Sequence, residues 1–322
     1  MSTPIFEVLK PGFLTTVQDR GRFYYQCMGA SLSGALDSFS HRIGNFLVGN
    51  SEDAAGLEMT VAGPTMRILQ DTWIAITGAN ISPKKDGLPL SMWTSVKVEE
   101  GNIISFGPLK EGCRGYLAVR GGISVPLVMG SCSTDLRLKE GGKEGRPLQT
   151  GDLLEIEPSE SRYEFIEKAL SPEWIPCYGS NPTLRVIMGP QARYFDKETG
   201  IKTFLESEYV VTPKANRIGY RLDGPAILHK EGLEASIPTE ACCPGGIQVP
   251  EDGKPIILMV EQNGGGYIKI ATIISSDFDL IAQLKPGDKI RFGKISVAKA
   301  HQILKKREKI IQRLKARLDS TN

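Results

Sequence analysis

Short apolar runs rich in Val, Ile, Leu and Thr recur along the chain, separated by turns that carry glycine or proline. Apolar and polar residues that alternate over such lengths are typical of β-strands. The 35 glycines and 20 prolines are scattered between the runs, so the pattern predicts a mainly β protein with many tight turns. The predicted strands fall within 72–80, 95–107, 114–122, 183–189, 254–262 and 267–275.

Three segments share a turn followed by an alternating strand: EEGNIISFG (99–107), QTGDLLEIE (149–157) and KPGDKIRFG (285–293). One interpretation is a repeated β architecture in which each segment closes a sheet or barrel. The other is that glycine-containing turns before strands are common in any β protein. The sequence is compatible with both interpretations.

Helical periodicity is rare before the carboxyl terminus. A helix is predicted over 38–49, with Phe39, Ile43, Phe46 and Leu47 on one face. Asp37 or Ser38 is its predicted N-cap and Gly49 its end. Two shorter helices are predicted within 190–207 and 277–284.

The last helix, over 297–318, has a heptad-like apolar stripe opposite a basic face. Packing on the body, docking to a partner and nucleic-acid binding compete as its role, and we favour the first two because basic solvated helix faces are common. Residues 159–182 lose the strand pattern and collect three prolines. We therefore predict a β domain at 1–158, a linker at 159–182, a β-barrel domain at 183–293 and a terminal helix at 294–322.

Charge and cysteine content restrict the class of protein. The 39 Lys and Arg nearly balance the 37 Asp and Glu, which argues against a nucleic-acid or membrane partner. No apolar run approaches the roughly 18 residues of a membrane span, and the first residues lack a secretory layout, so a cytoplasmic protein is expected. The six cysteines show no C-x-x-C pair and are expected to be reduced thiols, neither disulfides nor a zinc site.

Several familiar chemistries lack their motifs. The chain has no Walker loop and no dinucleotide fingerprint between a strand and a helix. The three histidines have no metal-binding spacing, and no G-x-S-x-G elbow is present. No lysine has the Met-Lys-Met setting of a biotin carrier, so biotin, if it takes part, comes on a partner chain. No metal site is expected.

The segment 15–37, TTVQDRGRFYYQCMGASLSGALD, gathers glycines and ionisable side chains before any long helix. Gln18 offers an amide, Asp19 an acceptor and Arg22 a forked donor, and the glycines allow the backbone to approach a small ligand. An amide-like or carboxylated ligand matches that set. The alternative is a structural loop in which Asp19 and Arg22 pair with each other and with the backbone.

The run 8–64, which contains this segment, and seven other segments together resemble the KipA family, the allophanate hydrolase subunit 2-like or biotin-dependent carboxyltransferase-like proteins. The others are ITGAN (76–80), YLAVRGGI (116–123), MGSCSTDLR (129–137), GGKEGRPLQTGD (141–152), SEYVVTPKANRIGYRLDGP (207–225), PGGIQVPEDGKPIILM (244–259) and GGYIKIATII (265–274). The resemblance reaches to about residue 292 and leaves out the basic tail.

The resemblance implies cyclophilin-like β-barrel domains. It also implies the C subunit of an ATP-dependent 5-oxoprolinase, which cleaves 5-oxo-L-proline to L-glutamate and is inactive without a KipI-like B subunit and a LamB/YcsF-like A subunit. Phosphorylation of the lactam oxygen by ATP turns that oxygen into a leaving group. Two alternatives remain: a carboxyltransferase component of a biotin-dependent urea or amide carboxylase, and a KipA-type regulator that antagonises a KipI-like kinase inhibitor.

Carried over position by position, the resemblance implies Asp19 and Lys269 as catalytic residues. In this hypothesis Asp19 and Gln248 hold an amide, Arg22 or Arg217 binds a carboxylate or phosphate, and Lys269 stabilises developing negative charge. The full set of implied substrate-binding residues is Gln18, Arg22, Ser33, Gly34, Arg217, Tyr220, Gln248, Gly265 and Gly266.

Purely structural interpretations compete at several of these positions. Tyr220 and Tyr267 suit core or rim aromatics, Glu58 a paired structural acid, and Lys269 an outward-facing solvated lysine. The segments EQNGGGYIKI (261–270) and PTEACCPGG (238–246) depart from the family pattern, so the resemblance predicts the fold more closely than the substrate.

Overall fold

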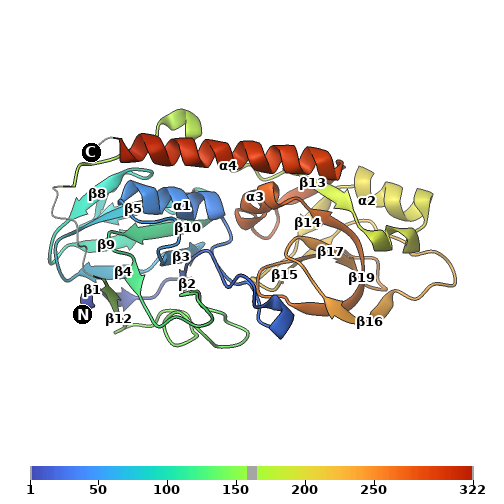
Figure 1. Ribbon diagram of the computed structural model, residues 1–322, viewed down its shortest axis with the longest axis horizontal. Coiled ribbons are helices and arrows are strands. Elements are labelled where there is room, and N and C mark those ends of the chain that lie inside the picture. Colours follow the sequence, from blue (N-terminus) through green and yellow to red (C-terminus); the bar gives the residue numbers. More distant parts are fainter. Residues whose placement is uncertain (1, 158–164, 321–322) are drawn as a thin grey trace. The chain divides into compact units, whose positions relative to one another are not determined.

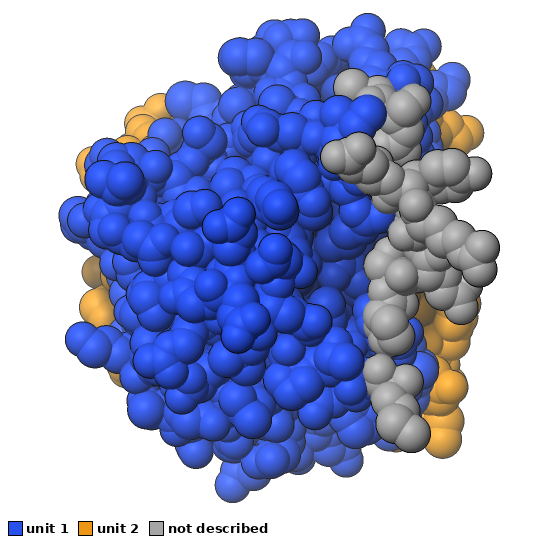
Figure 2. Space-filling view, turned by 90° about the vertical axis from the view of Figure 1, so that its left-hand side faces the viewer, with its two compact units in different colours: residues 1–22, 33–178, 309–322 blue, residues 23–32, 179–308 orange. Residues whose placement is uncertain are grey.

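The structure is a computed structural model that describes residues 2–157 and 165–320. The chain divides into two compact units (Figures 1 and 2). Unit 1 contains residues 1–22, 33–178 and 309–322, and unit 2 contains residues 23–32 and 179–308. The division at 178/179 lies inside the predicted linker, whose first residues, 159–164, are outside the described part.

Unit 1 is built from two β-sheets with antiparallel neighbours. The first sheet has the order β11-β12-β1-β4-β9-β6-β7 and the second the order β2-β3-β10-β5-β8. Their strands are β1 (Thr3–Lys10), β2 (Leu14–Gln18), β3 (Gly56–Thr60), β4 (Thr65–Ile68), β5 (Thr72–Asn80), β6 (Pro83–Lys85), β7 (Leu88–Pro89), β8 (Ser95–Val98), β9 (Ile103–Phe106), β10 (Glu111–Val119), β11 (Ile123–Ser124) and β12 (Leu153–Ile156).

The core of unit 1 follows from strand alternation, because each strand turns every second side chain toward the interior. Ile5, Val17, Leu57, Ile76 and Leu117 belong to one buried cluster that draws on both sheets. Helix α1 (Ser38–Leu47) contacts β5 and β10. It begins as predicted, because Asp37 Oδ1 accepts a hydrogen bond of 2.9 Å from the Ser40 amide.

Unit 2 contains a closed β-barrel of seven strands. The order β13-β20-β14-β15-β18-β17-β19 returns to β13 through the β13–β19 pairing, and β16 pairs with β19 outside the ring. The strands are β13 (Thr183–Met188), β14 (Tyr209–Val211), β15 (Gly219–Asp223), β16 (Ser236–Ala241), β17 (Gly246–Val249), β18 (Ile256–Leu258), β19 (Gly264–Ile273) and β20 (Lys289–Lys294). Closure leaves the ring without a free edge.

The mainly β fold class is confirmed, with a closed barrel in unit 2 and few short helices. The segments 149–157 and 285–293 supply β12 and β20: β12 lies between β1 and β11, and β20 lies between β13 and β14 in the ring. The predicted helical regions at 190–207 and 277–284 contain α2 (Lys202–Glu206) and α3 (Phe278–Ala282). The first of them also contains two further helical turns of five residues each, at Pro190–Tyr194 and Lys197–Ile201.

Helix α4 (Val297–Asp319) forms where the heptad-like stripe predicts it. In unit 1 its residues Ile311, Leu314 and Leu318 are buried in a cluster with Phe46 and Trp93. The predicted packing of this helix on the body is therefore confirmed for its carboxyl-terminal part. Val297, at the start of the helix, is 50% exposed. Within the described residues, none of the helices has both the length and the apolar character that crossing a membrane requires.

Candidate functional site

The carboxylate of Asp19 organises a buried loop junction in unit 1. Asp19 follows β2, and its Oδ1 accepts hydrogen bonds from the Gly21 amide (2.8 Å), Ser131 Oγ (2.7 Å) and Ser133 Oγ (2.5 Å). Its Oδ2 accepts one from the Cys132 amide at 2.6 Å. Four donors on one carboxylate fix the 131–133 segment against the end of β2.

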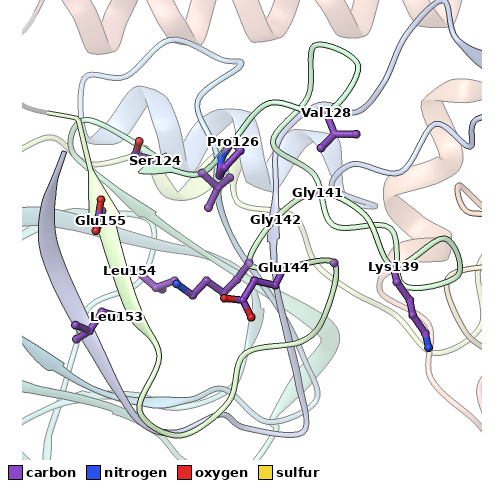
Figure 3. A pocket seen from close by; sticks show the side chains of 13 residues that line it. Ser124, Pro126, Val128, Lys139, Gly141, Gly142, Glu144, Leu153, Leu154 and Glu155 are labelled. Atoms are coloured by element: carbon purple, nitrogen blue, oxygen red, sulfur yellow. The ribbon is translucent and has the colours of Figure 1, made fainter. Parts of the chain in front are cut away.

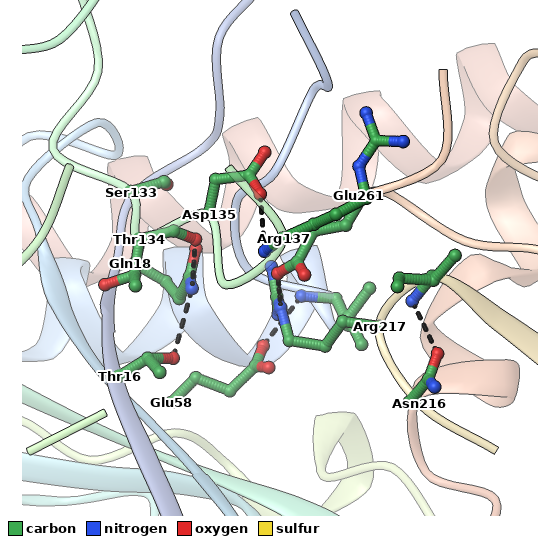
Figure 4. Close-up of polar contacts among 12 residues, drawn as sticks. Thr16, Gln18, Glu58, Ser133, Thr134, Asp135, Arg137, Asn216, Arg217 and Glu261 are labelled. Atoms are coloured by element: carbon green, nitrogen blue, oxygen red, sulfur yellow. Dashed lines mark hydrogen bonds and ion pairs between the residues drawn. The ribbon is translucent and has the colours of Figure 1, made fainter. Parts of the chain in front are cut away.

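Gln18 is fully buried and donates from Nε2 to Thr16 Oγ1 and to the Thr134 carbonyl, each at 3.1 Å (Figure 4). Ser33 and Gly34 have left-handed backbones, with φ of 52° and 86°. A Cβ at Gly34 would lie 2.7 Å from the Arg20 carbonyl oxygen, so this position requires glycine. The loop therefore passes close to the backbone that carries Asp19.

Arg22 is 3% exposed and binds two carbonyl groups of the same region. Its Nε donates to the Val128 carbonyl at 3.2 Å, and its Nη2 donates to the Ser133 carbonyl. Its Nη1 has no hydrogen-bond partner among the described residues, and the same holds for Gln18 Oε1 and Ser33 Oγ. Three of the implied binding residues thus carry a buried polar atom that a polar ligand could satisfy.

A second buried network in unit 1 centres on Tyr116, which the sequence analysis did not single out. Tyr116 Oη donates to Glu58 Oε2 at 2.7 Å and accepts from the Asp37 amide at 2.8 Å. Burial, and then the negative charges of Glu58 and Asp37, raise the pKa of Tyr116 well above its ordinary value, so it remains a neutral donor. Its place in an apolar strand run gave no sign of this role.

Unit 2 brings three implied binding residues, Gln248, Gly265 and Gly266, to the wall of one cavity of about 310 Å³. The other residues of this cavity, here called the amide pocket, combine amides, cations and apolar groups. They are Lys214, Asn216, Ile218, Gly219, Arg221, Ile256, Leu258, Gln262 and Tyr267. Such a lining suits a small polar molecule with an anionic group.

Gly265 is required for the position of the Gln248 side chain. A Cβ at Gly265 would lie 2.6 Å from Gln248 Nε2, closer than packed side chains allow. The same Nε2 lies 3.7 Å from Cys242 Sγ. Glycine at 265 therefore lets the Gln248 amide lie against the backbone of β19.

Lys269 lies opposite Gln248 in the β17–β19 ladder, and its charge is paired. Lys269 Nζ is 2.6 Å from Glu240 Oε1, which also accepts from Gln191 Nε2 at 2.7 Å. These two bonds, that of Lys269 first, lower the pKa of the Glu240 carboxyl below its ordinary value. Lys269 lies between the buried Ile268 and Ile270 and is not an isolated surface lysine.

Arg217, Tyr220 and Lys269 are not among the residues that line the amide pocket in unit 2. Arg217 Nε is 2.5 Å from Glu261 Oε1, and both side chains are 2% exposed. Tyr220 is 1% exposed, and its neighbours in β15, Gly219 and Arg221, are the ones at the pocket wall. Successive side chains of a strand point to opposite faces, so Tyr220 points to the core.

Asp19 belongs to unit 1 and Lys269 to unit 2, and their joint action stays a prediction. Across residues 2–157 and 165–320, no three His, Cys, Asp or Glu side chains gather as a metal-binding group.

The family of this chain is shown by a match to a protein-family model. The model of the carboxyltransferase domain, subdomain A and B, matches residues 28–294. The chain belongs to this family, and the resemblance seen in the motifs is confirmed.

Similar proteins fall into two groups. The C subunit of 5-oxoprolinase from Escherichia coli (strain K12) is 36% identical over 321 residues, which are 99% of this chain and 100% of the relative. That of Haemophilus influenzae is 32% identical over 319 residues, with 99% and 100% covered. The crystal structure of the Kluyveromyces lactis urea amidolyase matches with a TM-score of 0.90 and 32% identity, over 98% of this chain but only 20% of that one.

Proposed function

We propose that this chain is the C subunit of an ATP-dependent 5-oxoprolinase that cleaves 5-oxo-L-proline to L-glutamate. The observation that carries the proposal is the end-to-end match to two 5-oxoprolinase C subunits, each covered over its whole length. In the proposed complex a KipI-like B subunit and a LamB/YcsF-like A subunit are partners, and the chain alone is inactive. The complex works in the cytoplasm.

The chemistry of the amide pocket supports a lactam with a carboxylate. Gln248 Oε1 can accept the lactam N–H, and Asn216 Nδ2 can donate to the lactam oxygen, since Asn216 already uses its Oδ1 for the Ile218 and Gly219 amides. Lys214 and Arg221 line the same pocket and make no ion pair among the described residues, so they are available to the carboxylate.

In the proposed reaction ATP and two water molecules convert 5-oxoproline to glutamate, ADP and phosphate. Lys269 supplies positive charge where negative charge develops on the lactam oxygen. Asp19, with all its hydrogen bonds made inside unit 1, acts by positioning the 131–133 loop rather than by proton transfer. Gln18, Arg22 and Ser33 offer their unpartnered polar atoms to a ligand.

A second candidate is a carboxyltransferase component that moves a carboxyl group from biotin on a partner chain to urea or another amide. The TM-score of 0.90 to a urea amidolyase favours it. This chain corresponds to about a fifth of that protein, so the other reacting parts would have to come from partner chains.

One assay separates the two candidates. The chain is coexpressed with its KipI-like and LamB/YcsF-like partners, and glutamate and phosphate are measured after 5-oxoproline and ATP are added. Equimolar glutamate and phosphate that depend on this chain support the proposal. Carboxylation of urea by the chain with a biotinylated partner, without glutamate release, would favour the second candidate instead.

A further inference from the structure

Charged side chains line cavities in both units, but they are arranged differently. In unit 1, a cavity of about 580 Å³ between β12 and the loop 139–145 is lined by two lysines and two glutamates (Figure 3). Positive and negative side chains are equal in number there, so the lining favours no particular ligand charge. A cavity in unit 2 has both paired and unpaired charges, and the unpaired ones form a specific set.

The cavity in unit 2 has a volume of about 390 Å³ and is here called the side pocket. It shares three wall residues, Lys214, Arg221 and Ile256, with the amide pocket. Arg221 of β15 lies opposite Ile256 of β18 in the strand ladder. The side pocket is therefore adjacent to the amide pocket, and both cavities have the same two cations in their walls.

Two acidic residues, Asp223 and Asp252, distinguish the side pocket from the amide pocket. Both line the side pocket, whereas the described residues that line the amide pocket include no acid. Asp223 is paired, because Lys254 Nζ lies 2.8 Å from its Oδ1 and also donates to the Gly224 carbonyl. Asp252 accepts a hydrogen bond of 3.0 Å from the Lys254 amide and makes no ion pair among the described residues.

The turn that carries Asp252 is held in one position. Gly253 has a φ of 72°, and a Cβ there would lie 2.8 Å from Ala226 Cβ. Glycine at 253 therefore allows the turn to pack against Ala226. The next residue, Lys254, connects the turn to the end of β15 through Asp223. These contacts fix the backbone that places Asp252 at the pocket wall.

The unpaired charges of the side pocket are two cations and one anion. Lys214 and Arg221 make no ion pair among the described residues, and neither does Asp252. An acidic α-amino acid carries the complementary set, two carboxylates and one ammonium group. A dicarboxylate without the ammonium group leaves Asp252 without a partner, and a neutral amino acid leaves one of the cations without one. Pairing of every charge favours the acidic amino acid over both.

We propose that the side pocket binds an acidic α-amino acid, with its two carboxylates at Lys214 and Arg221 and its ammonium group at Asp252. Because the same two cations line the amide pocket, an amino acid bound here withdraws them from the carboxylate of 5-oxoproline. The side pocket is then an inhibitory site. This inhibition rests on the proposed function, whereas the binding is argued only from the residues of the pocket.

The test is isothermal titration calorimetry of the full chain with L-glutamate and with glutarate, which has two carboxylates but no ammonium group. We expect glutamate to bind about tenfold more tightly, the gain of one charge-assisted hydrogen bond. Asp252→Asn is expected to raise the Kd for glutamate about tenfold without weakening the binding of glutarate. The matched control is Glu251→Gln, since Glu251 is an exposed acid beside Asp252 that does not line the pocket, and it should leave both Kd values unchanged.

Thermal unfolding of both variants checks that they are folded. Absence of glutamate binding to the wild-type chain would overturn the proposal, as would equal Kd values for glutamate in wild type and Asp252→Asn. If Asp252→Asn does not fold, the two probes on the wild-type chain still decide, because equal Kd values for glutamate and glutarate contradict a role for the ammonium group.

Phosphate release by the assembled complex tests the inhibition. Added glutamate is expected to raise the KM for 5-oxoproline, and Asp252→Asn to require about tenfold more glutamate for the same effect. Inhibition that is unchanged in Asp252→Asn would contradict an inhibitory side pocket. Glutamate binding that depends on Asp252, in a chain whose complex does not turn over 5-oxoproline, would support the side pocket and contradict the proposed function. Turnover of 5-oxoproline without glutamate binding to this chain would do the reverse.

Discussion

Lys269 Nζ lies 2.6 Å from Glu240 Oε1, and Gln191 binds the same oxygen. The pair fixes the ammonium group of Lys269, a residue of β19 whose backbone lies opposite that of Gln248 in the β17–β19 ladder. A lysine held in this way has little freedom to reorient, which is what stabilisation of a developing oxyanion requires.

Replacement of this lysine tests the role assigned to its charge. Lys269→Ala is expected to lower kcat of the assembled complex by about 10²–10³-fold with little change in KM, because the lost interaction forms mainly in the transition state. Steady-state kinetics of glutamate release measures both constants. Glu240→Gln keeps the lysine charge and is the matched control, with a smaller loss expected. A Lys269→Ala complex with wild-type kcat would remove Lys269 from the mechanism.

Replacement of Asp19 tests its structural role. Asp19→Ala leaves two serine hydroxyls and two amides without their acceptor, and each orphaned buried donor costs about 1–3 kcal/mol. We expect a loss of at least about 3 kcal/mol in the free energy of unfolding, measured by urea denaturation. Asp19→Asn keeps one acceptor oxygen and should lose less. Wild-type stability of the alanine variant would show that the junction contributes nothing.

The pairing of Asp152 with Arg146 predicts a pH dependence of stability. Arg146 Nη1 and Nη2 each donate to the Asp152 carboxylate at 2.8 Å. This bond, ahead of the Gln149 amide, lowers the pKa of Asp152 below its ordinary value of 3.8. A lowered folded-state pKa contributes stability that is complete above the unfolded pKa and is lost as the pH falls through the folded one.

The measurement compares wild type with Asp152→Asn by urea unfolding at several pH values. The difference in unfolding free energy should be constant at neutral pH and shrink from about pH 5 downward, through and below 3.8. Arg146→Gln should reproduce the same profile. A difference that is as large at pH 3 as at pH 7 would mean that the ion pair does not set it.

The strands and helices were largely readable from the sequence because their periods are local. TWIAITGAN became β5, and Asp37 caps α1, since both signals need only neighbouring residues. Closure of the barrel was not readable from periodicity. Closure depends on the pairing of β13 with β19, which places Val186 opposite Ile273 although the two residues lie far apart in the sequence.

For the candidate site, the sequence predicted which residues take part but not how they lie relative to one another. Asp19 meets Ser131 and Ser133 more than a hundred positions away, and no local pattern connects them. From the sequence, the 15–37 loop was either a ligand-binding loop or a structural loop. In unit 1, Asp19 binds the Cys132 amide and two serine hydroxyls, and Arg22 binds the Val128 carbonyl, which are contacts of the structural kind. Nothing in the sequence showed that Arg217 pairs with Glu261, because their proximity depends on the folded barrel.

The central claim is that the amide pocket of unit 2 holds the lactam of 5-oxoproline. The KM for 5-oxoproline, measured by glutamate release from the assembled complex, tests it most directly when Gln248 is replaced by leucine. Loss of one hydrogen bond to the substrate predicts a KM about tenfold higher, while Gln302→Leu on the exposed face of α4 should leave the KM unchanged. A Gln248→Leu complex with the wild-type KM would contradict the claim.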